Sequence, residues 1–97
     1  MPLADVYWIE ASGNYSRVHV KKRAHLVTKT LAALVRGGLD PDVFVRVHRS
    51  VIVNRRRIST IESLRRGDAN LVLCDGTNVP CSRRYREELR RRIPCFV

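Results

Sequence analysis

The 97-residue sequence has little of what marks secreted, membrane-spanning or metal-binding proteins. It contains three cysteines, Cys74, Cys81 and Cys95, and none of them belongs to a C-x-x-C pair. An odd number of widely spaced cysteines favours reduced, structural thiols over a disulfide framework or a zinc site. No apolar run approaches the length of a membrane span, and the first residues lack the basic-then-apolar order of a signal peptide. We therefore expect a cytoplasmic protein with no membrane contact and no bound metal.

Signatures of catalysis are also scarce. The sequence has no Gly-rich phosphate loop and no G-x-S-x-G motif. His48 and Ser50 lie two residues apart, but no acidic residue stands at a spacing that suggests a shared site. The acidic residues Glu10, Asp68 and Asp75 fall in separate turns or strands. The sequence thus predicts a protein that is not an enzyme and that carries no cofactor.

Acidic residues are few, because nine Asp and Glu stand against 19 Lys and Arg and the formal net charge is +10. Sixteen of the 19 cationic residues are arginine, whose guanidinium group binds phosphates and guanine edges in a forked geometry. This charge indicates a nucleic-acid partner. A basic surface that only aids solubility is the plainer alternative.

Aromatic residues make up only 6% of the sequence, and most of them occupy positions whose alternation is typical of a core. Proteins that bind RNA or single-stranded DNA usually stack bases on exposed aromatic side chains. The pattern therefore favours duplex DNA as the partner, with an RNA-binding or ribosome-associated basic module as the alternative.

Alternation of apolar and polar residues, which is typical of strands, runs through most of the chain. Strands are expected over residues 5–11, 15–21, 25–28, 43–47, 58–64, 69–74 and 78–81; the first two form a hairpin and the last three a meander. Two short helices are expected, one capped by Thr30 and ended by Gly37 and Gly38, and one capped by Ser82. Because the middle of the chain lacks helical periodicity, loops rather than a recognition helix would face the partner.

The other features are organised around one stretch, residues 44–57, with the sequence FVRVHRSVIVNRRR. It begins as a strand, presents His48, Arg49 and Ser50, continues through three apolar residues and ends in Arg55, Arg56 and Arg57. We interpret it as a loop that its apolar residues fix to a small core. The loop would then hold its polar and cationic side chains towards a polyanion.

Two further arginine clusters, residues 83–84 and 90–92, could each contact phosphates or serve another role. Arg83 and Arg84 follow an apolar strand directly, which favours a shared electrostatic footprint on phosphates over independent solvated charges. The cluster at residues 90–92 fits either a phosphate contact or the favourable interaction of cations with a helix C-terminus.

Several of these runs together resemble the LytTR-type DNA-binding domain. They are WIEASGNY (residues 8–15), FVRVHRSVIVN (44–54), DG (75–76) and VPCSRR (79–84), and the resemblance covers about residues 5–93. It implies a mostly β fold, an elongated array of small antiparallel sheets with two short helices. It also implies the output domain of a bacterial response regulator, which binds direct repeats in promoter DNA with loop side chains.

The resemblance assigns roles to individual residues. Bases would be contacted by Ser16, Arg49 and Arg84, and arginine is well suited to the O6 and N7 atoms of guanine. Residues that would contact or position the DNA backbone are Asn14, Arg17, His48, Arg55, Arg56, Arg57 and Arg83. Ser50 and Asn54 would hold the loop by hydrogen bonds to the protein backbone.

The resemblance also bears on domain organisation. We expect residues 1–97 to form a single LytTR-like domain that lacks the family's first strand, because only four residues precede the first expected strand. A missing strand would leave a sheet edge open, and a second copy of the chain could pair with it on DNA. A receiver or sensor domain would lie outside this chain.

Overall fold

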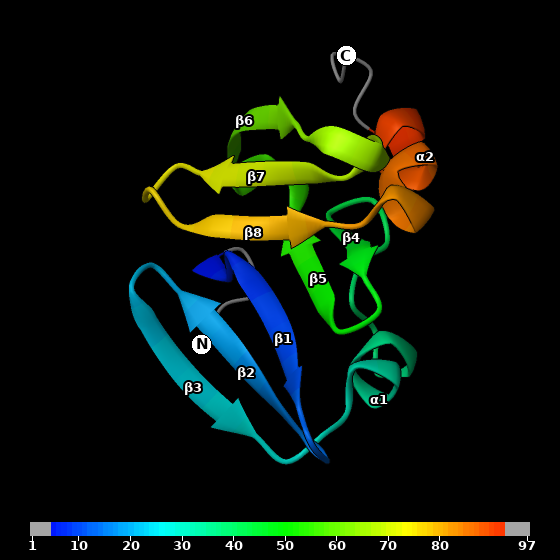
Figure 1. The fold of residues 1–97 in the computed structure, drawn as a ribbon. Helices are drawn as coiled ribbons and strands as arrows, with labels where there is room; N and C mark the ends of the chain where they lie inside the picture. The colour runs from blue at the N-terminus through cyan, green and yellow to red at the C-terminus, as the bar shows by residue number, and fades with distance from the viewer. Residues whose placement is uncertain (1–4, 93–97) are drawn as a thin grey trace.

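The computed structural model describes residues 5–92, which form two antiparallel sheets and two α-helices (Figure 1). The five-stranded sheet has the order β3-β2-β1-β5-β4, and the three-stranded sheet has the order β6-β7-β8. The strands are β1 (Trp8–Ser12), β2 (Tyr15–Val20), β3 (Arg23–Val27), β4 (Phe44–His48), β5 (Val51–Asn54), β6 (Ile58–Ser63), β7 (Ala69–Leu73) and β8 (Asn78–Cys81). The helices are α1 (Leu31–Arg36) and α2 (Arg83–Arg92), with short 3₁₀ turns η2 (Arg55–Arg57) and η3 (Arg65–Gly67). The mostly β fold is confirmed.

The first three strands form a meander joined by two-residue turns. Gly13 and Asn14 connect β1 to β2, and Gly13 has φ +63°, a conformation that glycine adopts at little cost. The predicted alternation of β2 is confirmed, because Ser16 and Val18 are buried whereas Tyr15 and Arg17 are exposed. The next turn is at residues 21–22, so β3 begins two residues earlier than predicted.

The central stretch differs from its interpretation as an anchored loop. Val51–Asn54 is a strand, β5, whose four residues are all buried. It pairs with β4 on one side and with β1 on the other, so residues 44–54 form a β-hairpin. A strand that is buried on both faces has a continuous apolar sequence rather than an alternating one, which explains why the sequence did not reveal it.

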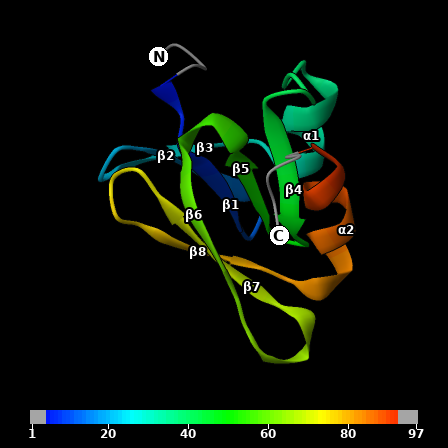
Figure 2. The ribbon, with the colours of Figure 1, turned by 90° about the horizontal axis from the view of Figure 1, so that it is seen from above.

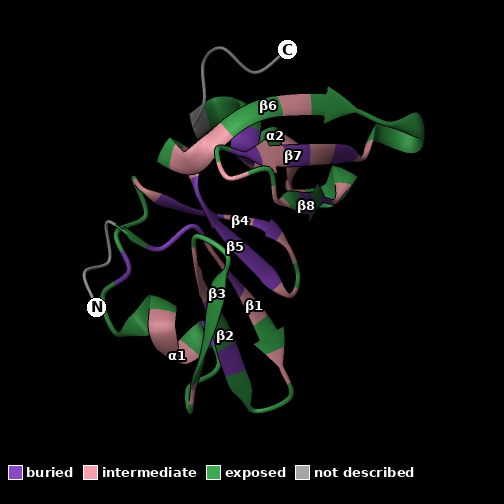
Figure 3. Cartoon of the chain, turned by 90° about the vertical axis from the view of Figure 1, so that its left-hand side faces the viewer, coloured by how far each residue is buried: buried purple, intermediate pink, exposed green. Residues whose placement is uncertain are grey.

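The core lies on both faces of the five-stranded sheet. Val45, Val47 and Val53 belong to a cluster with the inner residues of β7 and with Leu89 of α2. Residues of opposite parity, including Phe44 and Ile52, belong to a second cluster with α1. Buried positions are therefore concentrated on β4, β5 and β7 (Figure 3). Both helices lie on the side of β4 (Figure 2).

The expected open sheet edge is not found at the first described strand. β1 pairs with β2 on one side and with β5 on the other, and the outer strands of the described sheet are β3 and β4. Within residues 5–92, no helix is long and apolar enough to cross a membrane. Cys95 and the C-terminal residues 93–97 of the chain lie outside the described residues.

Candidate nucleic-acid interface

Two of the three predicted contact segments lie at one end of the five-stranded sheet. The β1–β2 turn contains Asn14, and the β4–β5 turn contains Arg49 and Ser50. The two turns are neighbours because the backbone N–H of Ala11 donates to the carbonyl of Ser50 over 2.8 Å. Asn14 and Arg49 are exposed. The two hairpin turns therefore lie at the same end of the five-stranded sheet (Figure 1).

The third segment, at the start of α2, lies beside the end of β4. The backbone N–H of Ser82 donates to the carbonyl of Val47 over 2.8 Å. The first N–H of the helix, at Arg83, donates to Oδ1 of Asp68 over 2.9 Å, a cap that the sequence did not reveal. Arg83 and Arg84 are exposed. The β4–β5 hairpin therefore lies between the other two predicted segments and is hydrogen-bonded to both.

The β4–β5 turn is held by hydrogen bonds between its own residues, His48 and Ser50. Nδ1 of His48 accepts the backbone N–H of Ser50 over 3.2 Å and lies 3.1 Å from Oγ of Ser50. A ring nitrogen that accepts a backbone N–H carries no proton, so the neutral ring has its proton on Nε2. His48 therefore offers an Nε2–H donor from a fixed ring. The Ser50 hydroxyl lies against this ring and not on a backbone atom, which was the partner predicted for it.

Arg46 also supports this turn, although the sequence analysis missed it. Its Nε donates to the carbonyl of His48 over 3.3 Å, and its Nη2 donates to the carbonyl of Arg49. Both bonds reach protein backbone atoms, so they fix the path of the turn and leave the Arg49 side chain exposed. The only signal in the sequence was a charged residue inside an otherwise apolar strand.

The assignment of Ser16 to a base contact is contradicted by its position. Ser16 has 0% of its surface exposed, and its hydroxyl donates to the carbonyl of Lys29 over 2.6 Å. A side chain in that position has no surface to present to DNA. Its neighbours Tyr15, which is 45% exposed, and Arg17 point to the other face of β2. These two residues, together with Asn14, are the ones that the first segment exposes.

Arg17 is available for an external partner because the acidic residue opposite it in the strand pair is bound to another side chain. Glu10 lies opposite Arg17 across the strand pair, but its Oε1 is 2.9 Å from Nε2 of His19. The His19 ring in turn stacks on Trp8, with centroids 3.9 Å apart and an angle of 6° between the planes. Among residues 5–92, Arg17 is in no ion pair.

Arg55, Arg56 and Arg57 lie at the opposite end of β5 from the β4–β5 turn. Asn54 holds this end, because its Nδ2 donates to the carbonyl of Val6 over 2.8 Å and its Oδ1 accepts the N–H of Arg56 over 3.0 Å. The guanidinium of Arg57 lies 4.8 Å from the centre of the Tyr7 ring. The predicted role of Asn54 is confirmed, but the structure does not bring these arginines to the three contact segments.

The two described cysteines differ in their surroundings. Cys81 is buried, and burial raises the pKa of its thiol to about 11. Cys74 is exposed and hydrogen-bonds to Tyr7, and this contact, followed by burial, raises the pKa of the Tyr7 hydroxyl. Neither cysteine is in a disulfide. Over residues 5–92, no three His, Cys, Asp or Glu side chains are grouped so as to hold a metal ion.

Comparisons with known proteins agree on one family. Residues 1–94 match the family model of the LytTr DNA-binding domain. The chain is 31% identical over 89 residues to the sensory transduction protein LytT of Bacillus subtilis, covering 92% of this chain and 36% of that protein. It is 39% identical over 90 residues to the CO-responsive transcriptional regulator RcoM of Rhodospirillum rubrum, covering 90% of this chain and 37% of that protein.

A solved structure gives the same result. A LytTr DNA-binding domain from Bacillus cereus superposes with a TM-score of 0.87 at 27% identity, covering 99% of this chain and 86% of that chain. The chain spans little more than a third of the length of the two curated relatives.

Proposed function

Because the chain belongs to the LytTr DNA-binding domain family, we propose that it reads a specific duplex sequence with three segments that lie along one side of the molecule. The segments are the β1–β2 turn, the β4–β5 turn and the start of α2. The observation that supports this proposal is the pair of backbone hydrogen bonds, Ala11–Ser50 and Ser82–Val47, that joins the β4–β5 hairpin to the other two segments. Sequence-specific binding requires several side chains in fixed register on one duplex.

Arg49 and Arg84 are the proposed base-reading residues. Both are exposed at the ends of ordered elements, and arginine can donate two hydrogen bonds to O6 and N7 of guanine. In the first segment Tyr15 and Arg17 replace Ser16, since Ser16 is buried. Phosphate contacts are assigned to Asn14, Arg17, His48 and Arg83.

The β4–β5 turn is preorganised for this role. The two bonds from Arg46 and the His48–Ser50 pair hold the turn before DNA arrives. Less conformational entropy is then lost when DNA binds. His48 would donate from Nε2 to a phosphate oxygen beside the base that Arg49 contacts.

The biological setting follows from the length of the relatives. Because those proteins are longer, we propose that this domain is the output of a regulator that also has a receiver or sensor domain. Two copies would bind direct repeats of promoter DNA, and the site of action would be the cytoplasm, where promoter DNA is found.

Selection from random duplexes tests the proposal. The purified chain should enrich a short motif, and the selected duplex should outcompete a structured RNA of equal charge at matched salt, because both competitors then supply the same phosphate attraction. Enrichment of no motif, or preference for the RNA, would contradict duplex reading.

A further inference from the structure

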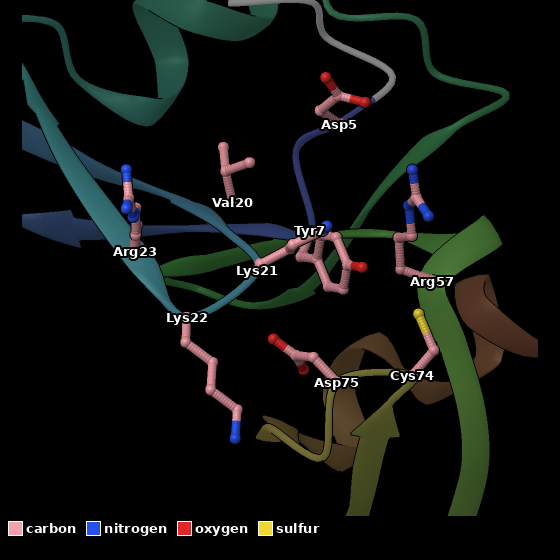
Figure 4. Close-up of a pocket in the computed structure, with 9 residues that line it drawn as sticks. All are labelled: Asp5, Tyr7, Val20, Lys21, Lys22, Arg23, Arg57, Cys74 and Asp75. Carbon is pink, nitrogen blue, oxygen red and sulfur yellow. The ribbon is translucent and has the colours of Figure 1, made fainter.

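The end of the molecule opposite the three contact segments holds an open cavity of about 860 Å³ (Figure 4). Its walls come from four separate parts of the chain, the first of which, with Asp5 and Tyr7, precedes β1. Lys21, Lys22 and Arg23 belong to the β2–β3 connection, Arg57 follows β5, and Asp75 belongs to the β7–β8 connection. Figure 4 shows the Lys21 side chain extending across the cavity towards Tyr7 and the Asp75 carboxylate facing the same space.

The topology separates this cavity from the proposed DNA interface. β2 begins next to the β1–β2 turn and ends at the Lys21–Lys22 turn, six residues later. At the usual rise of a strand, that distance is about 20 Å. Arg57 likewise lies beyond the far end of β5. The cavity therefore lies at the ends of β2 and β5 that are remote from the β1–β2 and β4–β5 turns.

The three cations of the β2–β3 connection are not explained by the fold. Lys21 has φ +54°, in the left-handed region that costs a residue with a side chain roughly 1 kcal/mol and that glycine or asparagine adopts more easily. A lysine at this place in the turn weakens the hairpin. Among residues 5–92, Lys21, Lys22 and Arg23 are in no ion pair. Uncompensated cations at a strained position are typical of a binding site.

We infer that this cavity binds a small phosphate-bearing molecule. Cations of the β2–β3 connection and Arg57 line the same cavity, and a multiply charged oxyanion suits such a lining. The carboxylates of Asp5 and Asp75 also line the cavity. They repel an extended polyanion such as DNA but can accept hydrogen bonds from hydroxyl or amino groups on a small ligand. The volume lies within the range of about 300–1,000 Å³ that is usual for small-molecule sites.

Titration calorimetry with inorganic pyrophosphate tests this inference. The wild-type chain should show one saturable site. The double variant Lys21→Asn/Lys22→Asn should bind at least tenfold more weakly, and asparagine tolerates the left-handed turn, so this variant should fold. The matched control Lys29→Ala/Arg36→Ala removes the same charge outside the cavity and should change the affinity less than twofold.

Three results would overturn the inference. The first is the absence of saturable binding. The second is an equal loss of affinity in both double variants, which would indicate diffuse attraction to a basic protein. The third is displacement of pyrophosphate by duplex DNA, which would place the bound phosphate at the DNA interface. Retention of pyrophosphate by the DNA-bound chain supports a separate site.

Discussion

Replacing Ser16 with alanine separates a structural role from a base-reading role. The Ser16 hydroxyl is fully buried and donates to the Lys29 carbonyl over 2.6 Å. Alanine removes this hydrogen bond, worth about 1 kcal/mol, and leaves the carbonyl without its partner. Because Lys29 is exposed, water can restore part of the loss. We expect the free energy of unfolding to fall by about 1.5 kcal/mol.

The assay compares stability with DNA recognition in the same variant. For a domain of this size, the expected loss lowers the melting temperature by roughly 6–12 °C. Binding to a selected duplex, measured well below that temperature, should change less than about twofold, because the side chain has no exposed surface. Ser59→Ala is the matched control: Ser59 is exposed on β6, and this variant should change stability by less than about 0.5 kcal/mol.

A different result would refute this reasoning. If Ser16→Ala lost discrimination between the selected and random duplexes while keeping its melting temperature, Ser16 would contact a base. The hairpin would then have to open before DNA binds.

Three further predictions concern the rest of the fold. Asn54→Ala removes two hydrogen bonds at a buried position and should lower the free energy of unfolding by about 3 kcal/mol, whereas the exposed Asn78→Ala should lower it by about 0.5 kcal/mol or less; chemical denaturation measures both. Lys21→Asn should raise the free energy of unfolding by about 0.5–1 kcal/mol because it relieves the left-handed strain, whereas Lys22→Asn should not raise it. Equal changes in the free energy of unfolding of the two variants would exclude strain at Lys21. Burial raises the pKa of Cys81 from 9.0 to about 11, so the unfolded thiol loses its proton first as the pH rises between these values. The free energy of unfolding should then decrease over this interval by up to about 1.4 kcal/mol per pH unit, and Cys81→Ala should remove that part of the slope.

Strands that bury only one face were predicted well from the sequence. The strand that buries both of its faces was not. The alternation of β2 predicted the first hairpin, and the turn at Asp75 and Gly76 predicted the meander of the last three strands. β5 was missed because Val51, Ile52 and Val53 have no alternation. Both of its faces contact the core, and only the assembled sheet shows this.

For Ser16, the periodicity of the strand predicted the position of the side chain better than the family resemblance did. Its parity on β2 places it with Val18, on the buried face. The family resemblance instead suggested a base contact. For this side chain the local alternation predicted the environment correctly, because one face of the hairpin packs against the core.

Arg55, Arg56 and Arg57 were wrongly grouped with Arg49 because they are close to it in the sequence. A strand of four residues separates them and carries the three arginines to the other end of the sheet. The cavity beside Arg57 could not be predicted at all, since its walls come from four segments that lie more than ten residues apart in the chain.

The discrimination between specific and random duplex DNA by Arg49→Ala tests the central claim most directly. Arg46 holds the turn through the carbonyl of Arg49, so truncating the Arg49 side chain leaves the turn in place. We predict a loss of about 1–3 kcal/mol on the selected duplex and a much smaller loss on random duplex. Arg56→Ala, at the far end of β5, is the control and should preserve discrimination. Equal losses on both duplexes for Arg49→Ala would make Arg49 a phosphate contact and contradict base reading by this turn.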